Sequence, residues 1–261
     1  MHYRRKFFSS NSRYLDFDLI RKNPKIFCGY SDITTLHFAL YTKCNFITFY
    51  GPTAIAEFGE KINFEKYTEE YFFKAVASNL PIGKVSPSEK WTDCRKANWL
   101  KKEDLRLKRE YKKNKGYEWL RKGKAEGKII GGCITSMMHT KGTEYWPDFS
   151  EKILLLETPE GESFFKGEPL SNIDGFLADL RLLGILKKIK GLIFGRGFGY
   201  SDDEIEKLKE IILFNTRGFD FPILYGLDIG HTDPKITIPL GVSVTLDSEK
   251  NIFSIDESGV N

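Results

Sequence analysis

Residues 25–50 read KIFCGYSDITTLHFALYTKCNFITFY, and extended and helical patterns alternate along this run. The apolar residues 25–28 predict a short buried strand, and residues 29–32 predict a turn. Apolar side chains at helical spacing then predict a helix over residues 33–43, and residues 46–50 predict a second strand. A strand, a helix and another strand in succession are typical of a parallel sheet with a crossover helix.

The same alternation runs through the rest of the chain, without an internal repeat. Helices are predicted over residues 14–22, 65–79, 133–139, 173–183 and 202–213. Strands are predicted over residues 129–132, 152–157, 191–195 and 222–225, with late antiparallel strands over residues 236–244 and 252–255. We therefore expect an α/β fold with two parts, residues 1–90 and 126–261, and a basic connector or insertion over residues 91–125.

The composition is that of an ordinary soluble protein, with 41% hydrophobic and 29% charged residues among 261. Apolar runs such as residues 153–156 are far shorter than the about 20 residues that cross a bilayer. No apolar stretch follows the basic residues 4–6, so a secretory signal is not predicted. The four cysteines lack CxxC spacing and a nearby histidine, which indicates reduced thiols. We expect a cytoplasmic protein with no metal, cofactor or membrane partner.

Positive charge is concentrated in the connector. Residues 95–124 contain 13 Lys and Arg against 4 Asp and Glu, a net charge of +9, so the remainder carries 4 − 9 = −5. Such a segment attracts anions, but we favour a solvated helix or loop over nucleic-acid binding. Trp91, Trp99 and Trp119 lie in or beside it. These rings either line a substrate entrance, with Trp99 foremost, or pack the junction between the two parts of the fold.

Ser31 follows the first predicted strand, lies on a glycine-containing turn and precedes a helix. This is the arrangement of a nucleophile elbow, which exposes a serine Oγ at the carboxyl edge of a sheet. The backbone N–H of Asp32 would point into the same space from a helix N-terminus, where it can stabilise an oxyanion. The GxSxG pattern lacks its final glycine, and the alternative is that Ser31 or Asp32 only caps the helix.

A nucleophilic serine needs a base with a pKa near neutrality, usually histidine. His2 lies at the N-terminus, His37 lies on a helix face that we expect to be structural, and His139 lies on another predicted helix. His231 follows a strand and a glycine, in the kind of loop where α/β folds place functional side chains. His231 is therefore the preferred base.

Two carboxylates are candidates for orienting this histidine. Glu157 ends the strand predicted over residues 152–157, and Asp228, three residues before His231, either orients it or only forms a turn. Arg196 lies between two glycines at the end of another strand. It either binds an anionic group of the substrate or forms a structural ion pair, and the residues alone do not choose between these alternatives.

Motifs at four separate places, in the right order, resemble the LD-carboxypeptidases, serine peptidase family S66. They are a nucleophile motif in residues 23–34 (NPKIFCGYSDIT), the start of the C-terminal domain in residues 129–148 (with IIGGC and GTEYWPD), a glutamate strand in residues 155–158 (LLET) and a histidine segment in residues 227–241 (LDIGHTDPKITIPLG). The resemblance extends from about residue 14 to the C-terminus. The GTEYWPD stretch and the Trp-rich connector are most similar to the microcin C immunity branch of the family.

The resemblance implies a triad in which Ser31 attacks an amide carbonyl, His231 transfers the proton and Glu157 holds the imidazole. It also implies a Rossmann-like parallel-sheet N-terminal domain, a β-rich α/β C-terminal domain, a site between them, and the homodimer that is common in the family. The implied substrates are murein LD-peptides or, in the immunity branch, a peptidyl nucleotide whose base stacks on an aromatic side chain. Trp99, or else Trp91, is the candidate for that stacking.

The N-terminal region departs from the family pattern. Family members begin with a further strand and helix that include a Gly-Gly pair feeding the oxyanion hole, whereas residues 1–13 resemble only the segment that follows. We therefore expect a truncated N-terminal domain in which the Asp32 N–H lacks a partner donor. Losing one such donor lowers a rate by about 10²–10³. The alternative function is a weak or inactive relative that only binds peptide or nucleotide ligands.

Overall fold

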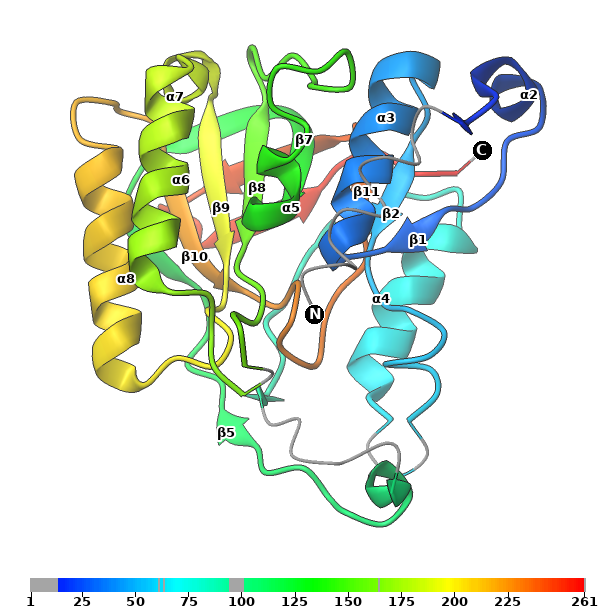
Figure 1. Ribbon diagram of the computed structural model, residues 1–261, viewed down its shortest axis with the longest axis vertical. Helices are drawn as coiled ribbons and strands as arrows, with labels where there is room; N and C mark the ends of the chain where they lie inside the picture. The colour runs from blue at the N-terminus through cyan, green and yellow to red at the C-terminus, as the bar shows by residue number, and fades with distance from the viewer. Residues whose placement is uncertain (1–13, 61, 63, 94–100, 164, 261) are drawn as a thin grey trace.

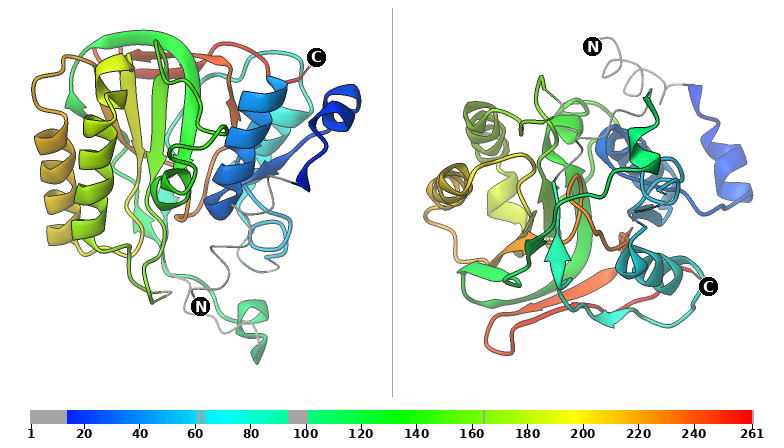
Figure 2. Two further views of the ribbon diagram at one scale, coloured as in Figure 1. Left: turned by 45° about the horizontal axis from the view of Figure 1, so that its top comes forward. Right: turned by 90° about the horizontal axis from the view of Figure 1, so that it is seen from below.

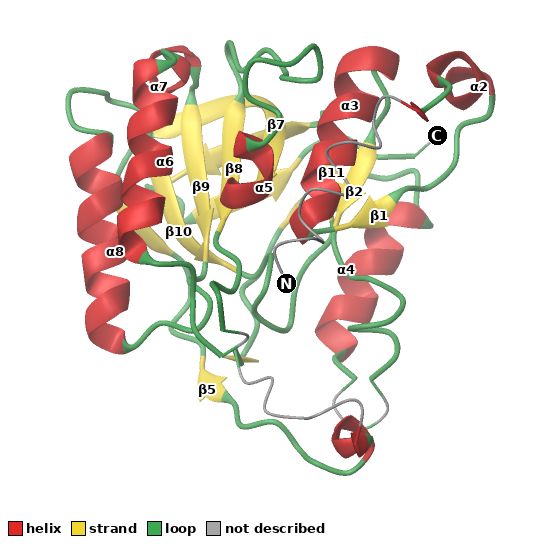
Figure 3. Ribbon diagram, in the orientation of Figure 1, coloured by secondary structure: helices red, strands yellow, loops and turns green. Residues whose placement is uncertain are grey.

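The computed structural model describes residues 14–260 except 61, 63, 94–100 and 164 (Figure 1). Two mixed sheets lie side by side in this part of the chain, one of three strands and one of eight. Figure 3 separates the helices from the strands and shows that helices flank both sheets. The fold class expected from the sequence, mixed α/β, is confirmed.

The three-stranded sheet carries the turn that follows residues 25–28. β1 (Cys28–Gly29) and β2 (Thr48–Tyr50) are parallel, with Gly29 opposite Tyr50. The crossover between them is α3 (Thr34–Cys44), which ends at Asn45 in the left-handed conformation that often closes helices. β11 (Ile238–Leu240) comes from far along the chain and pairs antiparallel with β2. The predicted strand–helix–strand unit is confirmed. α2 (Phe17–Lys22) precedes it and α4 (Lys66–Val76) follows it.

The eight-stranded sheet is built on four parallel strands. These are β7 (Lys124–Cys133), β8 (Ile153–Glu157), β9 (Gly191–Gly195) and β10 (Ile223–Leu227). β8, β9 and β10 are buried along their whole length, which is why their sequences are nearly continuous apolar runs. Antiparallel strands complete both sides: β12 (Ser243–Asp247), β13 (Ile252–Ile255) and β3 (Gly83–Lys84) beyond β7, and β6 (Glu118–Arg121) beyond β10.

Helices cover one face of the parallel strands. α6 (Leu170–Leu182) and α8 (Asp202–Asn215) lie side by side in front of β9 and β10, while β12 and β13 curl behind the parallel strands (Figure 2). The short helices α5 (Ile134–Met138) and α7 (Ile185–Lys188) follow β7 and α6. All the carboxyl ends of the parallel strands consequently meet at one edge of the sheet, which is where α/β folds place their sites.

Each of the two expected parts of the chain, residues 1–90 and 126–261, contributes a strand to the sheet formed mainly by the other part. β3, from residues 1–90, joins the eight-stranded sheet, whereas β11, from residues 126–261, joins the three-stranded sheet. The connector contributes β6 to the large sheet and also holds β5 (Lys112–Lys113), which pairs with β4 (Lys90–Trp91), and the 3-10 turn η4 (Glu103–Leu105). Among its described residues, the connector thus contains short strands and one 3-10 turn, and no α-helix.

One late strand was wrongly expected to be continuous. Residues 236–244 form two strands, β11 and β12, which belong to different sheets. Gly241 separates them at φ +95°, and a Cβ there would lie 2.8 Å from the ring of Tyr41. Glycine adopts this positive φ without steric strain, whereas other residues rarely do. The chain therefore turns at Gly241, and β11 joins the three-stranded sheet while β12 joins the eight-stranded one.

Two further features bear on the class of protein. Among the described residues, no helix is both long and apolar enough to cross a membrane. Cys28, Cys44 and Cys133 are free thiols, as expected, while Cys94 lies outside the described residues. Burial and the nearby carboxylate of Glu57 raise the pKa of Cys28 to about 12, against a small lowering by a backbone hydrogen bond, so this thiol stays protonated.

Candidate active site

Ser31 occupies the turn between β1 and α3, in the short 3-10 helix η2 (Ser31–Ile33). Its φ is +62°, a conformation that non-glycine residues rarely adopt and that marks a strained, functional turn. Gly29 makes the tight approach feasible, because a Cβ at that position would lie 3.1 Å from Ile33. The nucleophile-elbow geometry predicted for Ser31 is therefore present.

His231 lies in the loop between β10 and β11, within hydrogen-bond distance of two predicted partners. Its Nε2 is 3.0 Å from Ser31 Oγ, and its Nδ1 is 2.8 Å from Glu157 Oε2. A carboxylate only accepts hydrogen bonds, so Nδ1 carries a proton and the Nε2 of a neutral ring is available to accept the proton of Ser31. The structure thus brings together three residues that are 126 and 74 positions apart in sequence.

The histidine ring is fixed by its surroundings. It is 2% exposed, and the rings of Tyr30 and Phe198 meet it edge-on at centroid distances of 5.1 and 6.2 Å. The preceding Gly230 has φ +76°, and a Cβ there would lie 2.3 Å from Glu157 Oε2. Glycine is therefore required for the loop to pass so close to the carboxylate.

Glu157 ends β8 and is 1% exposed. Burial by itself would raise its pKa, but the charge of His231 and hydrogen bonds from His231, Tyr50 and Cys133 outweigh it, and the pKa is lowered below the ordinary 4.5. The carboxylate is consequently ionised at neutral pH. An ionised carboxylate at Nδ1 is what holds the ring in the productive tautomer and stabilises the imidazolium that forms.

Tyr50 is a site residue that the sequence did not reveal. Its hydroxyl donates to Glu157 Oε1 at 2.5 Å and accepts from the Ser31 N–H at 3.3 Å. The side chain is 1% exposed. Tyr50 ends β2, the strand beside β1, so the carboxyl edge of the small sheet supplies both the nucleophile and the group that links it to Glu157. The only hint in the sequence was that Tyr50 places a polar hydroxyl at the end of the apolar strand predicted over residues 46–50.

Glu160 is a second residue that sequence reasoning missed. It follows β8 by three residues, and its Oε2 lies 3.2 Å from His231 Nε2. A backbone bridge with Gly167 holds this part of the loop. Because a carboxylate only accepts hydrogen bonds, Glu160 can pair with Nε2 only when that nitrogen carries a proton, as in the imidazolium that forms when His231 takes the proton of Ser31.

Asp32 directly follows the nucleophile, at the start of the helical segment, as predicted. Its Oδ1 accepts a hydrogen bond from Ser136 Oγ at 2.9 Å, which ties the elbow to α5. The Cys133 N–H donates to Thr34 Oγ1 at 3.1 Å and makes a second link between the elbow helix and the end of β7. Two hydrogen bonds thus hold the nucleophile turn against the end of β7 and the start of α5.

Asp228, the alternative partner for the histidine, is committed elsewhere. Its Oδ1 accepts from Arg196 at 2.8 Å, and its two oxygens also accept from the Oγ and N–H of Ser88. Arg196 is 6% exposed, and its guanidinium also donates to Gly226 O and lies 4.7 Å from the centre of the Trp91 ring. Of the two alternatives for Arg196, these contacts match the structural ion pair rather than a substrate clamp.

The other sequence candidates lie apart from the triad or outside the described residues. Trp91 is 8% exposed, and the charged groups of Arg196 and Lys112 lie 4.7 and 4.6 Å from the centre of its ring. His37 is fully buried, its Nε2 is 3.0 Å from Gly29 O, and burial lowers its pKa to about 4, against a small opposing contribution from that hydrogen bond. His139 is exposed. Trp99 and His2 fall outside the described residues.

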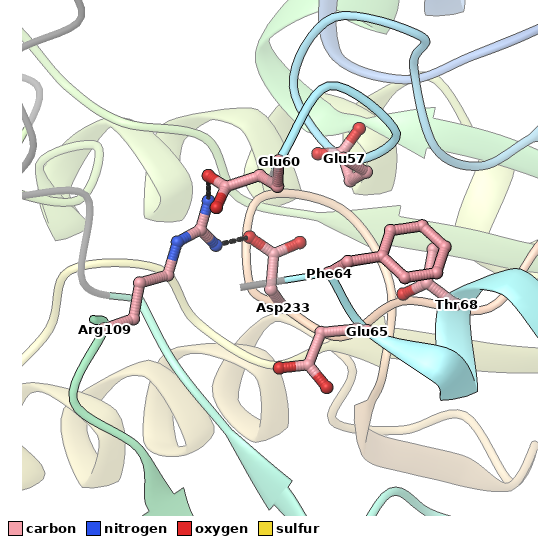
Figure 4. A pocket seen from close by; sticks show the side chains of 7 residues that line it. All are labelled: Glu57, Glu60, Phe64, Glu65, Thr68, Arg109 and Asp233. Carbon is pink, nitrogen blue, oxygen red and sulfur yellow. Dashed lines mark hydrogen bonds and ion pairs between the residues drawn. The ribbon is translucent and has the colours of Figure 1, made fainter. Parts of the chain in front are cut away.

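An acidic pocket lies beside the histidine loop (Figure 4). Arg109 reaches it from the connector, pairs with Glu60 and donates to Asp233 Oδ2 at 2.5 Å. Lys235 is buried and lies 2.5 Å from both Glu57 Oε1 and Asp233 Oδ1. Part of the connector's charge is therefore neutralised within the chain. The pocket is lined by Glu57, Glu60, Phe64, Glu65, Thr68, Arg109 and Asp233.

Comparisons with known proteins identify two family domains in this chain. The model of the LD-carboxypeptidase N-terminal domain matches residues 9–51, and that of the C-terminal domain matches residues 126–246. YocD of Bacillus subtilis is 35% identical over 239 residues, which cover 90% of this chain and 68% of YocD. The microcin self-immunity protein MccF of Escherichia coli is 33% identical over 251 residues, covering 94% of this chain and 69% of MccF.

The similarity extends to three-dimensional structure. A solved structure of MccF in complex with glutamyl sulfamoyl guanosine superimposes with a TM-score of 0.86 at 29% sequence identity, over 97% of this chain and 73% of that one. The two family domains thus lie on either side of the connector, and each contributes one side of the site built above. The chain belongs to the LD-carboxypeptidase family, peptidase family S66.

Proposed function

We propose that this chain is a serine-type peptidase or amidase that hydrolyses an amide bond in a small peptide-like substrate. One observation carries the proposal: His231 bridges Ser31 and Glu157 at 3.0 and 2.8 Å, on a serine whose φ is +62°. A buried ion pair or a helix cap would need neither the strained serine nor the shared imidazole. Membership of a peptidase family supports the same reaction class.

Each residue has a definite role in this proposal. Ser31 Oγ attacks the substrate carbonyl while His231 Nε2 takes its proton, and Glu157 keeps the imidazole oriented. The oxyanion forms at the start of the elbow helix, where the Asp32 N–H and the helix N-terminus favour negative charge. The proton then passes from Nε2 to the leaving nitrogen, the amide bond breaks, and water releases the acyl group by the same steps in reverse order.

Two substrate classes are proposed, a murein LD-peptide and a peptidyl or aminoacyl nucleotide. The first follows from the resemblance to LD-carboxypeptidases. The second is supported by the similarity to MccF, whose solved complex holds glutamyl sulfamoyl guanosine. Trp99 is the residue that we propose to stack on a nucleobase, since aromatic stacking tolerates any base.

The test is hydrolysis of a murein tetrapeptide and of an aminoacyl sulfamoyl nucleoside, followed by mass spectrometry. We expect the wild-type chain to cleave at least one of them and Ser31→Ala to cleave neither while its circular dichroism is unchanged. Ser171→Ala, an exposed serine on α6, is the matched control and should retain full activity. Full activity in Ser31→Ala would refute the proposal, and tight binding without cleavage by the wild type would favour the alternative of a binding protein.

A further inference from the structure

We propose that Lys235 is a positioning residue of the reaction, which holds the ring of Tyr30 against His231 and thereby keeps Ser31 and His231 aligned. The inference rests on the proposed function and deepens it, because it assigns the alignment of nucleophile and base to a buried ammonium group outside the triad. Lys235 is fully buried, so it acts on the reaction through the residues that it packs against rather than through the substrate.

Lys235 lies in the loop between β10 and β11 that also carries His231, and its ammonium group is buried with it. Nζ lies 2.5 Å from Glu57 Oε1 and 2.5 Å from Asp233 Oδ1, so the lysine pairs with two carboxylates. Lysine is almost never fully buried unless it is paired. Well-packed apolar residues of similar volume often replace a buried ion pair without loss of stability. A charge at this position consequently points to a role beyond packing.

Two contacts join this ion-pair cluster to Tyr30, the residue immediately before the nucleophile. The ammonium group of Lys235 lies 4.6 Å from the centre of the Tyr30 ring, within the range of a cation–π interaction. The Tyr30 hydroxyl donates to Glu57 Oε1 at 3.0 Å, and this is the same oxygen that pairs with Lys235. Lys235 and its partner Glu57 therefore hold both the ring and the hydroxyl of Tyr30.

Tyr30 in turn meets both groups that the reaction must align. Its ring lies edge-on to the ring of His231, at a centroid distance of 5.1 Å and an interplanar angle of 77°, which is a favourable arrangement for two rings. Its backbone continues into Ser31, and its carbonyl accepts from the Ile33 N–H at 3.2 Å within the nucleophile turn. A shift of Tyr30 would therefore move His231 Nε2 relative to Ser31 Oγ, two atoms that are 3.0 Å apart.

The size of the effect follows from the geometry that proton transfer requires. A misplacement of about 1 Å, caused by a substitution away from the reacting atoms, can lower a rate by about a hundredfold. Lys235→Met keeps most of the length of the side chain and removes the ammonium group. We therefore expect this substitution to lower kcat by between about tenfold and a hundredfold. KM should stay unchanged, because the substrate does not reach a fully buried residue.

The alternative is that Lys235 only balances the charge of its carboxylates. Lys235→Met/Glu57→Gln separates the two roles, because it removes one charge of each sign and leaves at position 57 an oxygen that can accept from the Tyr30 hydroxyl. We expect kcat to stay low in this double variant, whereas a role in charge balance alone would restore the wild-type kcat. The double variant also serves if Lys235→Met fails to fold with an unbalanced charge.

Lys209 offers a matched control on α8. It also pairs with two carboxylates, Glu118 and Glu206, and its Nζ lies 5.4 Å from the centre of the Tyr225 ring. We would measure kcat and KM of all variants on a murein tetrapeptide and on an aminoacyl sulfamoyl nucleoside, with circular dichroism as the check of folding. Lys209→Met should leave both constants unchanged. A wild-type kcat in the double variant, or an equal loss of kcat in Lys209→Met, would overturn the inference.

Nuclear magnetic resonance of the chain labelled with 15N-histidine keeps this inference separate from the proposed function, because it needs no turnover. The chain has four histidines, and the spectrum of His231→Ala assigns the signals of His231. We expect both Lys235 variants to displace the ring signals of His231 and to leave those of the exposed His139 in place, even if the wild type hydrolyses neither substrate. Unchanged His231 signals, or the same displacement in Lys209→Met, would overturn the positioning role.

Discussion

Tyr50→Phe isolates the hydroxyl that connects the nucleophile turn to the orienting carboxylate. The substitution keeps the buried ring and removes one oxygen, which donates to Glu157 Oε1 and accepts from the Ser31 N–H. Glu157 is 1% exposed, so water does not readily replace the lost donor. Hydrogen bonds to charged groups contribute about 1.5–3 kcal/mol, and we expect the free energy of unfolding at neutral pH to fall by about that amount.

The loss should depend on pH in a definite direction. The pKa of Glu157 is lowered in the folded chain, so its charge stabilises the fold above the ordinary pKa of 4.5, and this contribution is lost as the pH falls through the lowered value. Removing the Tyr50 donor raises the pKa of Glu157 and takes away part of that stabilisation. The difference between wild type and variant is therefore largest above pH 4.5 and shrinks at lower pH.

The assay is urea denaturation of both proteins at several pH values, together with hydrolysis at neutral pH, where we expect kcat/KM to fall about tenfold or more. Tyr200→Phe is the control, because its buried hydroxyl donates to a neutral carbonyl, Glu168 O, at 2.5 Å. Its effect on stability should not depend on pH in this range. Equal stability of Tyr50→Phe and wild type, or a loss that grows as the pH falls, would show that the Tyr50 hydroxyl does not stabilise the charged form of Glu157.

Three other substitutions test the histidine loop, the Arg196–Asp228 ion pair and the role of Trp99. Gly230→Ala should inactivate and destabilise the chain, because the new Cβ would lie 2.3 Å from Glu157 Oε2 at a φ of +76°. Hydrolysis rates and the melting temperature measure the effect, and normal activity would show that the loop tolerates a side chain at this position. Arg196→Met should lower the free energy of unfolding by about 3–5 kcal/mol, because Asp228 keeps an unpaired buried charge; a change in KM alone would mean that the arginine binds substrate. Trp99→Ala should raise KM for a nucleotide-bearing substrate and leave the melting temperature nearly unchanged, since stacking on a base contributes about 1–3 kcal/mol. A lower melting temperature and an equal loss of activity toward all substrates would indicate that Trp99 packs the fold instead.

The parts of the site that could be predicted from the sequence are those set by local patterns. A short strand, a glycine turn and a helix place Ser31 at the carboxyl edge of a sheet, and strand ends likewise make His231, Glu157 and Asp228 candidates. Each of these signals spans a few residues, because the backbone pattern of the turn itself exposes the side chain. Local pattern did not, however, choose between Glu157 and Asp228, since both follow strands. The family resemblance favoured Glu157, and in the structure Glu157 contacts His231 while Asp228 contacts Arg196.

The missed residues depend on contacts between distant segments. Tyr50 and Glu157 are 107 positions apart, and a tyrosine in an apolar strand reads as core until the register of β1 and β2 sets it beside Ser31. Glu160 lies in a loop whose course is fixed by its bridge to Gly167. Arg109 reaches Asp233 across 124 positions. Pairings of this kind are set by the assembled sheets, and sequence periodicity carries no information about them.

The strand exchange between the two sheets was unpredictable for a related reason. Residues 236–244 are apolar and β-branched, which indicates a strand but not the sheet that it joins. The positive φ of Gly241 divides the run, and β11 then pairs with β2 while β12 pairs with β7. This exchange positions the site, because β11 follows the His231 loop and anchors it next to Ser31.

The most direct test of the central claim is whether Ser31 and His231 act as one unit. We would measure kcat/KM of the wild type, Ser31→Ala, His231→Ala and the double variant on the same peptide-like amide. When two residues act together in one catalytic step, the effects of replacing them on kcat/KM are not additive in free energy. We predict that the double variant is no slower than the slower single variant. Losses that multiply, so that the double variant is slower than either single variant by the other's factor, would contradict it.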